Sequence, residues 1–323
     1  MKKLAFLFAG QGAQAVGMGQ DMAMQNATAK AVFDMGDALC PGISEICFIG
    51  DRETLNQTQN TQPCLFLTDL AIAKALRDAG VVPDAVAGFS LGEIPALAFA
   101  KAFSEEEAFR FVLLRGKNMG AQSALHPGGM VAALKLSAET VNMICTRFSE
   151  VWPVNYNCPG QICCAGSNAQ LDDFCNAVKE AGGRAVKLPV SGAFHTPYMQ
   201  DVATVLRDFL ENGNLQKPAI PVYANRTAAP YPADHASMVE TLSMQVCSPV
   251  KWENTLHAMF ADGIDTFVEV GAGSTLTGFV RRTLPDAKAF TVNDFATFET
   301  VRKELAEGSH HAGSTTTDTN VGF

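Results

Sequence analysis

The sequence is short of basic residues and of long apolar runs, and each shortage excludes a class of protein. Its 323 residues include 24 Lys and Arg against 33 Asp and Glu, which gives a formal net charge of −9. Binding to the phosphate backbone of nucleic acids requires a basic surface, so nucleic acid is not an expected partner. The N-terminal apolar run covers only residues 4–9, too short for the core of a signal peptide or for a membrane span. We therefore expect a soluble chain without a membrane anchor.

Paired cysteine motifs are also lacking. The nine cysteines are odd in number, none lies in a C-x-x-C motif, and no histidine lies at zinc-ligand spacing from them. In a chain of this length, such a pattern is typical of reduced thiols in the cytoplasm, and it argues against both a disulfide framework and a metal site. Hydrophobic residues at 47% and charged residues at 18% indicate a globular protein with a sizeable core.

Strand-like and helix-like segments alternate along the chain, which favours an α/β fold with a mainly parallel sheet. Strands are predicted at residues 4–9, 85–89, 222–224 and 266–270, and helices over 71–79, 90–100 and 104–120. Ser104 begins the last of these helices with capping-box spacing to Glu107.

The character of the sequence changes after the His-Pro-Gly-Gly segment at residues 126–129. Strands are predicted at 130–136, 162–165 and 185–190, with helices at 138–148 and 171–181 between them. This order suggests a small inserted α+β domain over residues 127–190, flanked by a discontinuous large domain of residues 1–126 and 191–307. Residues 308–323 are small and polar, and we expect a disordered tail there.

The pentapeptide at residues 88–92, GFSLG, fits the motif G-x-S-x-G. In that motif a tight strand-to-helix turn holds a nucleophilic serine, and the helix N-terminus offers backbone N–H groups to a developing oxyanion. Ser90 is therefore a candidate nucleophile. Ser90 with Glu93 also fits a capping box, in which the serine is only an N-cap. Pro95, about one turn into the helix, would remove a backbone donor and bend it.

His195 is a candidate base. It follows the predicted strand at residues 185–190 and precedes Thr196 and Pro197, a plausible N-cap and first helical residue. Catalytic groups often lie in such irregular segments between rigid elements. The alternative is a histidine that hydrogen-bonds within its own turn.

Arg115 is predicted to point inward. It shares an apolar stripe with Ala108, Phe111, Val112 and Met119 at helical spacing. A buried arginine is costly unless it is paired or faces a cleft. Two interpretations stay open at this point: an internal carboxylate partner, or a substrate carboxylate bound by the two-pronged guanidinium.

Together these residues resemble the malonyl-CoA:acyl-carrier-protein transacylase family, from about residue 3 to about residue 305. The resemblance is carried by blocks that share one order along the chain: FAGQGAQ at 8–14, TQP at 61–63, GFSLGE at 88–93, LRG at 114–116, NYNCPGQ at 155–161, PVSGAFHTP at 189–197, Gln245, SPVKW at 248–252 and EVG at 269–271. Any one block is weak, whereas their shared order is highly specific.

The resemblance implies a role for each main site residue. Ser90 would attack the thioester carbonyl of malonyl-CoA, and His195 would take the hydroxyl proton and later activate the acceptor thiol. The backbone N–H groups of Gln11 and Leu91 would form the oxyanion hole. Arg115 would bind the free carboxylate of the malonyl group.

Further roles follow from the same resemblance. The backbone carbonyl of Gln245 would orient the ring of His195, and Gln62 and Asn157 would lie near the acyl pocket. Phe194 matches the malonyl-selecting form of the histidine loop. Phe89 departs from the family, which usually has histidine immediately before the serine, so we do not expect the polar contact of that histidine in this chain.

The implied fold is an α/β-hydrolase-like large domain with a small ferredoxin-like insertion, and the implied reaction is ping-pong malonyl transfer in fatty acid or polyketide biosynthesis. Acyl carrier protein and a coenzyme A thioester would be the partners, with neither cofactor nor metal. The carrier is usually acidic in such systems, so it would need a local basic surface. Candidates for that surface are Lys179, Arg184, Lys187, Arg281 and Arg282.

Three other functions compete with malonyl transfer. One is an acyl hydrolase that acts on acyl-carrier proteins with the same serine and histidine. Arg115 argues against it, because hydrolases of this type tend to lack a carboxylate-binding arginine. A Ser-His-Asp lipase is disfavoured because no acidic residue between Ser90 and His195 has a convincing context. A carrier-binding module without activity would not need both side chains.

Overall fold

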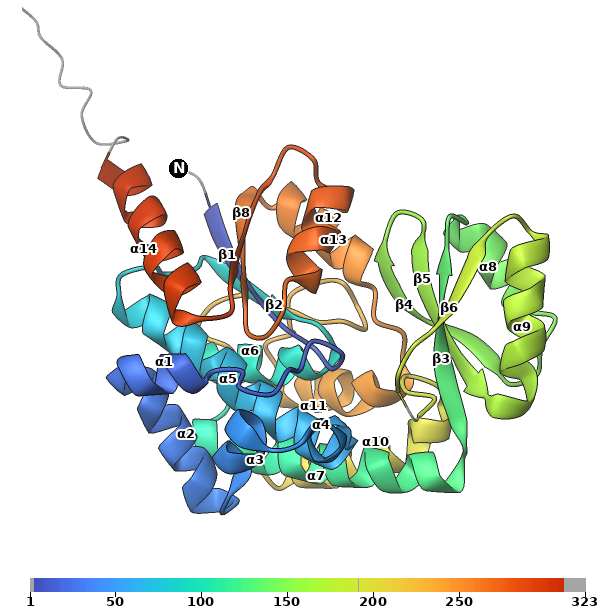
Figure 1. Ribbon diagram of the computed structural model, residues 1–323, viewed down its shortest axis with the longest axis horizontal. Helices are drawn as coiled ribbons and strands as arrows, with labels where there is room; N and C mark the ends of the chain where they lie inside the picture. The colour runs from blue at the N-terminus through green and yellow to red at the C-terminus, as the bar shows by residue number, and fades with distance from the viewer. Residues whose placement is uncertain (1–2, 191, 311–323) are drawn as a thin grey trace, which may run out of the picture.

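The computed structural model describes residues 3–190 and 192–310, which form two sheets with helices around them (Figure 1). The first sheet is parallel and has the strand order β7-β2-β1-β8-β9. Its strands are β1 (Lys3–Phe8), β2 (Ala85–Gly88), β7 (Val222–Tyr223), β8 (Ile264–Val270) and β9 (Lys288–Val292). Strand β1 is apolar on both faces because helices cover both sides of a parallel sheet.

The side chains of β1 alternate between two apolar cores. Phe6 and Phe8 belong to the core built with α2, α5, α6, α7 and α10, whereas Ala5 and Leu7 pack with α12 and α13 on the opposite face. The helices are α1 (Gln20–Gln25), α2 (Ala27–Leu39), α3 (Ile43–Ile49), α4 (Arg52–Asn56), α5 (Thr58–Asp78), α6 (Glu93–Phe99), α7 (Glu105–Leu125), α10 (Gln200–Glu211), α11 (His235–Ser243), α12 (Trp252–Ala261), α13 (Thr275–Thr283) and α14 (Phe295–His310), with the short 3-10 helices η1 (Ser90–Gly92), η2 (Pro197–Met199) and η3 (Met244–Cys247).

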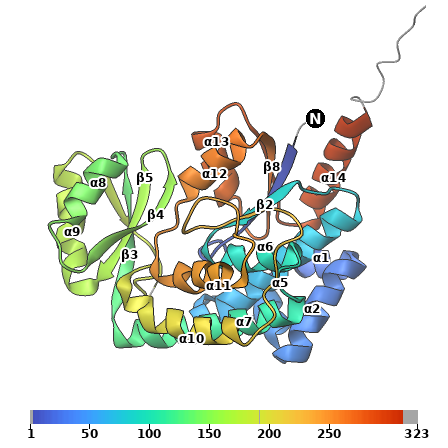
Figure 2. The ribbon, with the colours of Figure 1, turned by 180° about the vertical axis from the view of Figure 1, so that it is seen from behind.

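The second sheet is antiparallel and lies at one end of the molecule, as Figures 1 and 2 both show. Its order is β4-β5-β3-β6, built from β3 (Gly128–Leu134), β4 (Val151–Cys158), β5 (Gln161–Ser167) and β6 (Arg184–Lys187). Helices α8 (Ala138–Cys145) and α9 (Asn168–Glu180) cover the face that carries Val131 and Cys164. Met130 and Cys163, on the other face, join the core of the large body. The sheet therefore has two buried faces.

The predicted fold class is confirmed: a parallel α/β sheet is combined with a smaller α+β unit. The sequence missed β4, because Pro153 and two asparagines interrupt its apolar pattern. Pro153 is tolerated there because β4 is an edge strand whose register shifts after that residue. Strand β9 was also missed.

Several predicted boundaries were wrong, among them the end of α7, which lies at Leu125 rather than at residue 120, and the end of α8, which lies at Cys145 rather than at residue 148. Strand β6 ends at Lys187 rather than at residue 190, and α14 continues through residues 308–310, which were assigned to the tail. Residues 311–323 of the predicted tail lie outside the described residues. The division of the chain at residues 127 and 190 remains our proposal. Within the described residues, no helix combines the length and the apolar character needed to cross a membrane.

Candidate active site

Ser90 lies on a sharp turn between β2 and α6. Its φ of 53° falls in the left-handed region, which non-glycine residues rarely adopt. The turn is tight: a Cβ on Gly88 would lie 1.9 Å from the carbonyl carbon of Gly92, and one on Gly92 would lie 2.3 Å from the carbonyl oxygen of Phe8. Pro95 is tolerated in α6 because it is the third residue of that helix, a position where a backbone N–H would have no partner within the helix.

The side chains of Ser90 and His195, 105 positions apart, meet in the fold. Oγ of Ser90 lies 2.7 Å from Nε2 of His195. Its other partner among the described residues is Nη2 of Arg115 at 3.3 Å. The alternative in which Ser90 only caps a helix is therefore wrong, because its hydroxyl faces an imidazole and a guanidinium instead.

The ring of His195 is oriented by two backbone carbonyls. Nδ1 lies 3.0 Å from the oxygen of Gln245 and 3.1 Å from that of Ser248. Since a carbonyl only accepts, Nδ1 carries the proton and Nε2 is left to accept one from Ser90. These partners lie about fifty residues away, so the alternative of a bond within its own turn is wrong. As predicted, Thr196 caps the following helix η2, which begins at Pro197.

Burial keeps His195 neutral. Only 4% of its surface is exposed, and this burial, with the nearby charge of Arg115, lowers its pKa to about 4 although both carbonyl bonds favour the charged form. The imidazole is therefore unprotonated at neutral pH and ready to accept the serine proton.

Arg115 points inward from α7, which Ser104 caps through the N–H of Glu107. Only 1% of its surface is exposed. Nη1 donates to Oε1 of Gln62 at 2.7 Å, and Nη2 donates to Oε1 of Gln245 at 3.0 Å.

The guanidinium is charged but incompletely paired. Among the described residues Arg115 makes no ion pair, and its Nε has no hydrogen-bond partner. Burial lowers its pKa to about 10, against the opposing effect of Glu93, so it stays protonated at neutral pH. The internal carboxylate partner considered above is therefore not in contact with it, and the site retains a buried positive charge beside the serine hydroxyl.

Comparison with known proteins decides the family. The sequence model of the acyl transferase domain matches residues 5–314. The malonyl CoA-acyl carrier protein transacylase of Bacillus subtilis is 36% identical over 318 residues, which cover 97% of this chain and 100% of that protein. The chain belongs to the malonyl-CoA:acyl-carrier-protein transacylase family. It is thus an acyltransferase.

Solved structures agree with this assignment. The malonyl CoA-acyl carrier protein transacylase of Clostridium perfringens superposes with a TM-score of 0.91 at 37% identity, over 96% of this chain and 99% of that one. A malonyl-transacylase in complex with its type II polyketide synthase acyl-carrier protein superposes with a TM-score of 0.90 at 31% identity, over 94% and 100% of the two chains.

Of the remaining predicted site residues of this acyltransferase, some adjoin Ser90 or contact Arg115 and others do not. Leu91 is on η1, directly after Ser90, and Gln11 follows β1, whose end packs against η1 at Gly92. Gln62 contacts the arginine, as described. Asn157 and Phe194 are buried, but neither bonds to Ser90, His195 or Arg115: Asn157 donates to Sγ of Cys163 at 3.4 Å, and Phe194 packs in the main core.

Phe89 lies against aromatic rings rather than polar groups. Its ring centroid is 5.4 Å from that of Trp252 and 6.2 Å from that of Phe279. The position before the serine is therefore part of the apolar core on the α12–α13 side of the sheet.

Three further residues around the nucleophile were not predicted as site residues. Glu93 was considered only as a cap partner, and neither Asn225 nor Tyr231 was singled out. All three are buried, and their contacts with the serine turn span more than 130 residues. No local pattern in the sequence reports such contacts.

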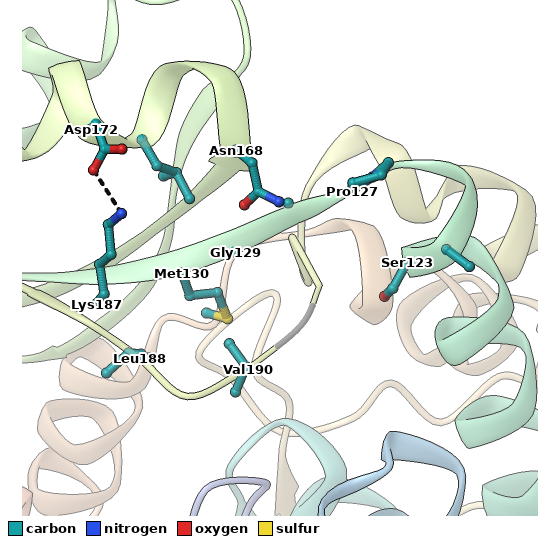
Figure 3. A pocket seen from close by; sticks show the side chains of 12 residues that line it. Ser123, Pro127, Gly129, Met130, Asn168, Asp172, Lys187, Leu188 and Val190 are labelled. Carbon is teal, nitrogen blue, oxygen red and sulfur yellow. Dashed lines mark ion pairs between the residues drawn. The ribbon is translucent and has the colours of Figure 1, made fainter.

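A separate cavity of about 610 Å³ lies between the end of α7, the start of β3 and the start of α9 (Figure 3). Met130 and Val190 line it, and an ion pair of 2.6 Å joins Lys187 and Asp172 at its side. Neither Ser90 nor His195 lines this cavity. Within the described residues, no group of three or more His, Cys, Asp or Glu is arranged to hold a metal ion.

Proposed function

We propose that this acyltransferase moves the malonyl group from malonyl-CoA to the phosphopantetheine thiol of an acyl carrier protein through a malonyl ester on Ser90. The observation that carries the proposal is the convergence on one oxygen: Oγ of Ser90 lies 2.7 Å from the base nitrogen of His195 and 3.3 Å from Nη2 of Arg115. The nucleophile, the base and the arginine that would bind a carboxylate are thus close enough to contact the same malonyl group.

The first half-reaction forms the ester. Nε2 of His195 takes the proton of Ser90 while Oγ attacks the thioester carbonyl. The N–H groups of Gln11 and Leu91 stabilise the resulting oxyanion; loss of one such donor typically costs about 100- to 1000-fold in rate. The tetrahedral intermediate then collapses, and coenzyme A leaves as a thiol with the proton from His195.

The second half-reaction runs in the opposite direction with a different thiol. His195 takes the proton of the phosphopantetheine thiol, and the thiolate attacks the malonyl ester. Ser90 leaves and regains its proton from the imidazolium. One site therefore serves two acceptors in turn, with Arg115 holding the malonyl carboxylate throughout.

The cellular role follows from the product. Malonyl carriers supply two-carbon units for fatty acid or polyketide synthesis, and both pathways fit the site equally. Nine cysteines without a disulfide among the described residues support a reducing compartment, so we place the enzyme in the cytoplasm.

Intact-mass measurement tests this function. Wild-type protein mixed with malonyl-CoA should gain one malonyl group and lose it to added holo-carrier protein. Ser90→Ala should gain none, whereas Ser123→Ala, which removes another buried serine hydroxyl, should behave as wild type. Release of the group only as free malonate would instead identify a hydrolase.

A further inference from the structure

The backbone of Ser90 is held by the side chain of Asn225, which follows β7 in the adjacent part of the sheet. Oδ1 of Asn225 accepts from the N–H of Ser90 at 2.7 Å, and its Nδ2 donates to the carbonyl of Gly88 at 2.6 Å. One amide therefore bridges the last residue of β2 and the first residue of the turn. Because the chain turns here, these two backbone groups cannot take part in the hydrogen bonds of the sheet or of the helix, and the amide of Asn225 pairs them instead.

Asn225 is itself fixed at its backbone. Its N–H donates to Oε2 of Glu93 at 2.8 Å, and its carbonyl accepts from the N–H of Lys251 at 2.9 Å. Tyr231 donates its hydroxyl hydrogen bond to the other oxygen of Glu93. The carboxylate of Glu93, the first residue of α6, thus ties the segment after β7 to the helix that follows the nucleophile.

The same carboxylate reaches the segment that orients the base. Nε2 of Gln245 lies 2.7 Å from the carbonyl of Ser90 and 3.3 Å from Oε2 of Glu93. The backbone carbonyl of Gln245 is the one that holds Nδ1 of His195. A continuous set of hydrogen bonds therefore runs from the nucleophile through a glutamine to the base.

We propose that Asn225 and Glu93 are positioning residues that hold the serine and the histidine in register for proton transfer, an inference that rests on the proposed function. Neither touches the reacting atoms. Asn225 acts through the backbone of Ser90, and Glu93 acts through the backbone of Asn225 and the side-chain amide of Gln245. Their contacts stabilise the left-handed conformation of Ser90, which is unfavourable unless its surroundings determine it. Small misplacement of reacting groups is costly, since a shift of about 1 Å can cost about 100-fold in rate.

The charge on Glu93 links this network to pH. Burial raises its pKa to about 7, although the hydrogen bonds from Tyr231, Asn225 and Gln245 and the charge of Arg115 favour the ionised form. The titratable groups that face it are Tyr231 and Arg115. Above pH 7 the carboxylate accepts all of these bonds. Protonation below pH 7 turns one oxygen into a donor and weakens the set.

Single-turnover acylation of the full chain by malonyl-CoA tests the inference. Asn225→Ala should lower the limiting rate constant about 10- to 100-fold, the typical effect of leaving buried hydrogen-bonding groups unpaired. The malonyl-CoA concentration at half-saturation should stay within about two-fold, because neither residue hydrogen-bonds to Arg115 or to Gln62. Asn225→Asp keeps the acceptor for the N–H of Ser90 but loses the donor to Gly88, so it should show a smaller loss.

A pH profile separates positioning from simple stability. The wild-type rate constant should fall as pH drops through about 7 and fall further near 4, where His195 titrates. Glu93→Gln should be slower at pH 8 but should lose the step near 7 while keeping the one near 4. Asn212→Ala removes an exposed asparagine whose amide also bonds a backbone carbonyl, and it should match wild type in rate and profile.

Each outcome decides the matter. The proposal would be overturned if Asn225→Ala reacted at the wild-type rate, or if it changed only the malonyl-CoA concentration at half-saturation. An unchanged pH profile in Glu93→Gln would also overturn it. If Asn225→Ala fails to unfold cooperatively on heating, Asn225→Asp and Glu93→Gln carry the test. If wild-type protein takes up no malonyl group, the proposed function is wrong. The rate at which phenylmethanesulfonyl fluoride sulfonylates Ser90, with loss of fluoride, then compares the same variants.

Discussion

Arg115 carries a full positive charge into a site where its present partners are two amide oxygens and a hydroxyl. Neutral partners leave most of the charge of the guanidinium uncompensated, whereas a carboxylate would neutralise it through charge-assisted hydrogen bonds. Arg115→Ala should therefore lower kcat/KM with malonyl-CoA about 100-fold, but with acetyl-CoA less than about 10-fold, since hydrogen bonds to charged groups are worth about 1.5–3 kcal/mol. Arg110→Ala, on the exposed side of the same helix, is the control. Equal losses with both substrates would remove the carboxylate-binding role.

The same guanidinium also affects the base. The positive charge of Arg115 disfavours the imidazolium of His195, and burial together with this charge lowers the pKa of His195 to about 4. Removing the charge in Arg115→Met should therefore raise the pKa of His195, while a buried ring still titrates below its ordinary value. The titration of the His195 ring followed by NMR checks this directly. A midpoint that stays in place or moves to lower pH would contradict the assignment.

At the scale of elements, the strand-turn-helix around Ser90 depends on the absence of two side chains. Gly88 and Gly92 approach so closely that a Cβ on the former would overlap the backbone of the latter. Since backbone cannot move aside as a side chain does, Gly88→Ala should lower the free energy of unfolding by more than about 3 kcal/mol or prevent folding. Gly120→Ala in α7 has open space around the added methyl and should stabilise the protein by about 0.5–1 kcal/mol. Urea unfolding measures both, and equal stabilities would contradict the steric argument.

The elements also show what the sequence can and cannot predict. The inward direction of Arg115 follows from helical periodicity, and the cap at Ser104 follows from local spacing, so both were predictable. Strand β4 was not, because it combines Pro153 with an irregular register that only an edge position tolerates. Asn225 was beyond reach for another reason: its contact with the serine turn spans 135 positions. Contacts of that range depend on which strands become neighbours, and β7 pairs with β2 only in the finished sheet.

At the scale of the whole molecule, the net charge of −9 opposes the approach of an acidic carrier protein, whereas local basic side chains favour it. Two of the basic candidates already have partners. Lys187 forms an ion pair with Asp172. Arg282 on α13 donates a hydrogen bond to Gln161 on β5, and its guanidinium lies over the ring of Phe279. The ion pair offsets the charge of Lys187, whereas the neutral partners of Arg282 leave its charge in place on the surface.

The two effects respond to salt with opposite signs. Repulsion from the dispersed negative charge would make kcat/KM for the carrier rise with salt, whereas docking on a local basic surface would make it fall. We expect kcat/KM for the carrier protein to fall between 0.05 and 0.5 M NaCl. The Debye length is about 10 Å at about 0.1 M salt, so the repulsion between distant charges is already screened there and the attraction between close charge pairs remains to be weakened. Acylation by a malonyl thioester of N-acetylcysteamine, which lacks the charged nucleotide, should change little, because Arg115 is buried and poorly screened. Arg281→Glu tests the basic residues of α13, and Lys179→Glu tests those of α9. Only the substitution at the docking surface should lower kcat/KM for the carrier protein. A carrier reaction that accelerates with salt would show that net charge, not a local surface, governs the encounter.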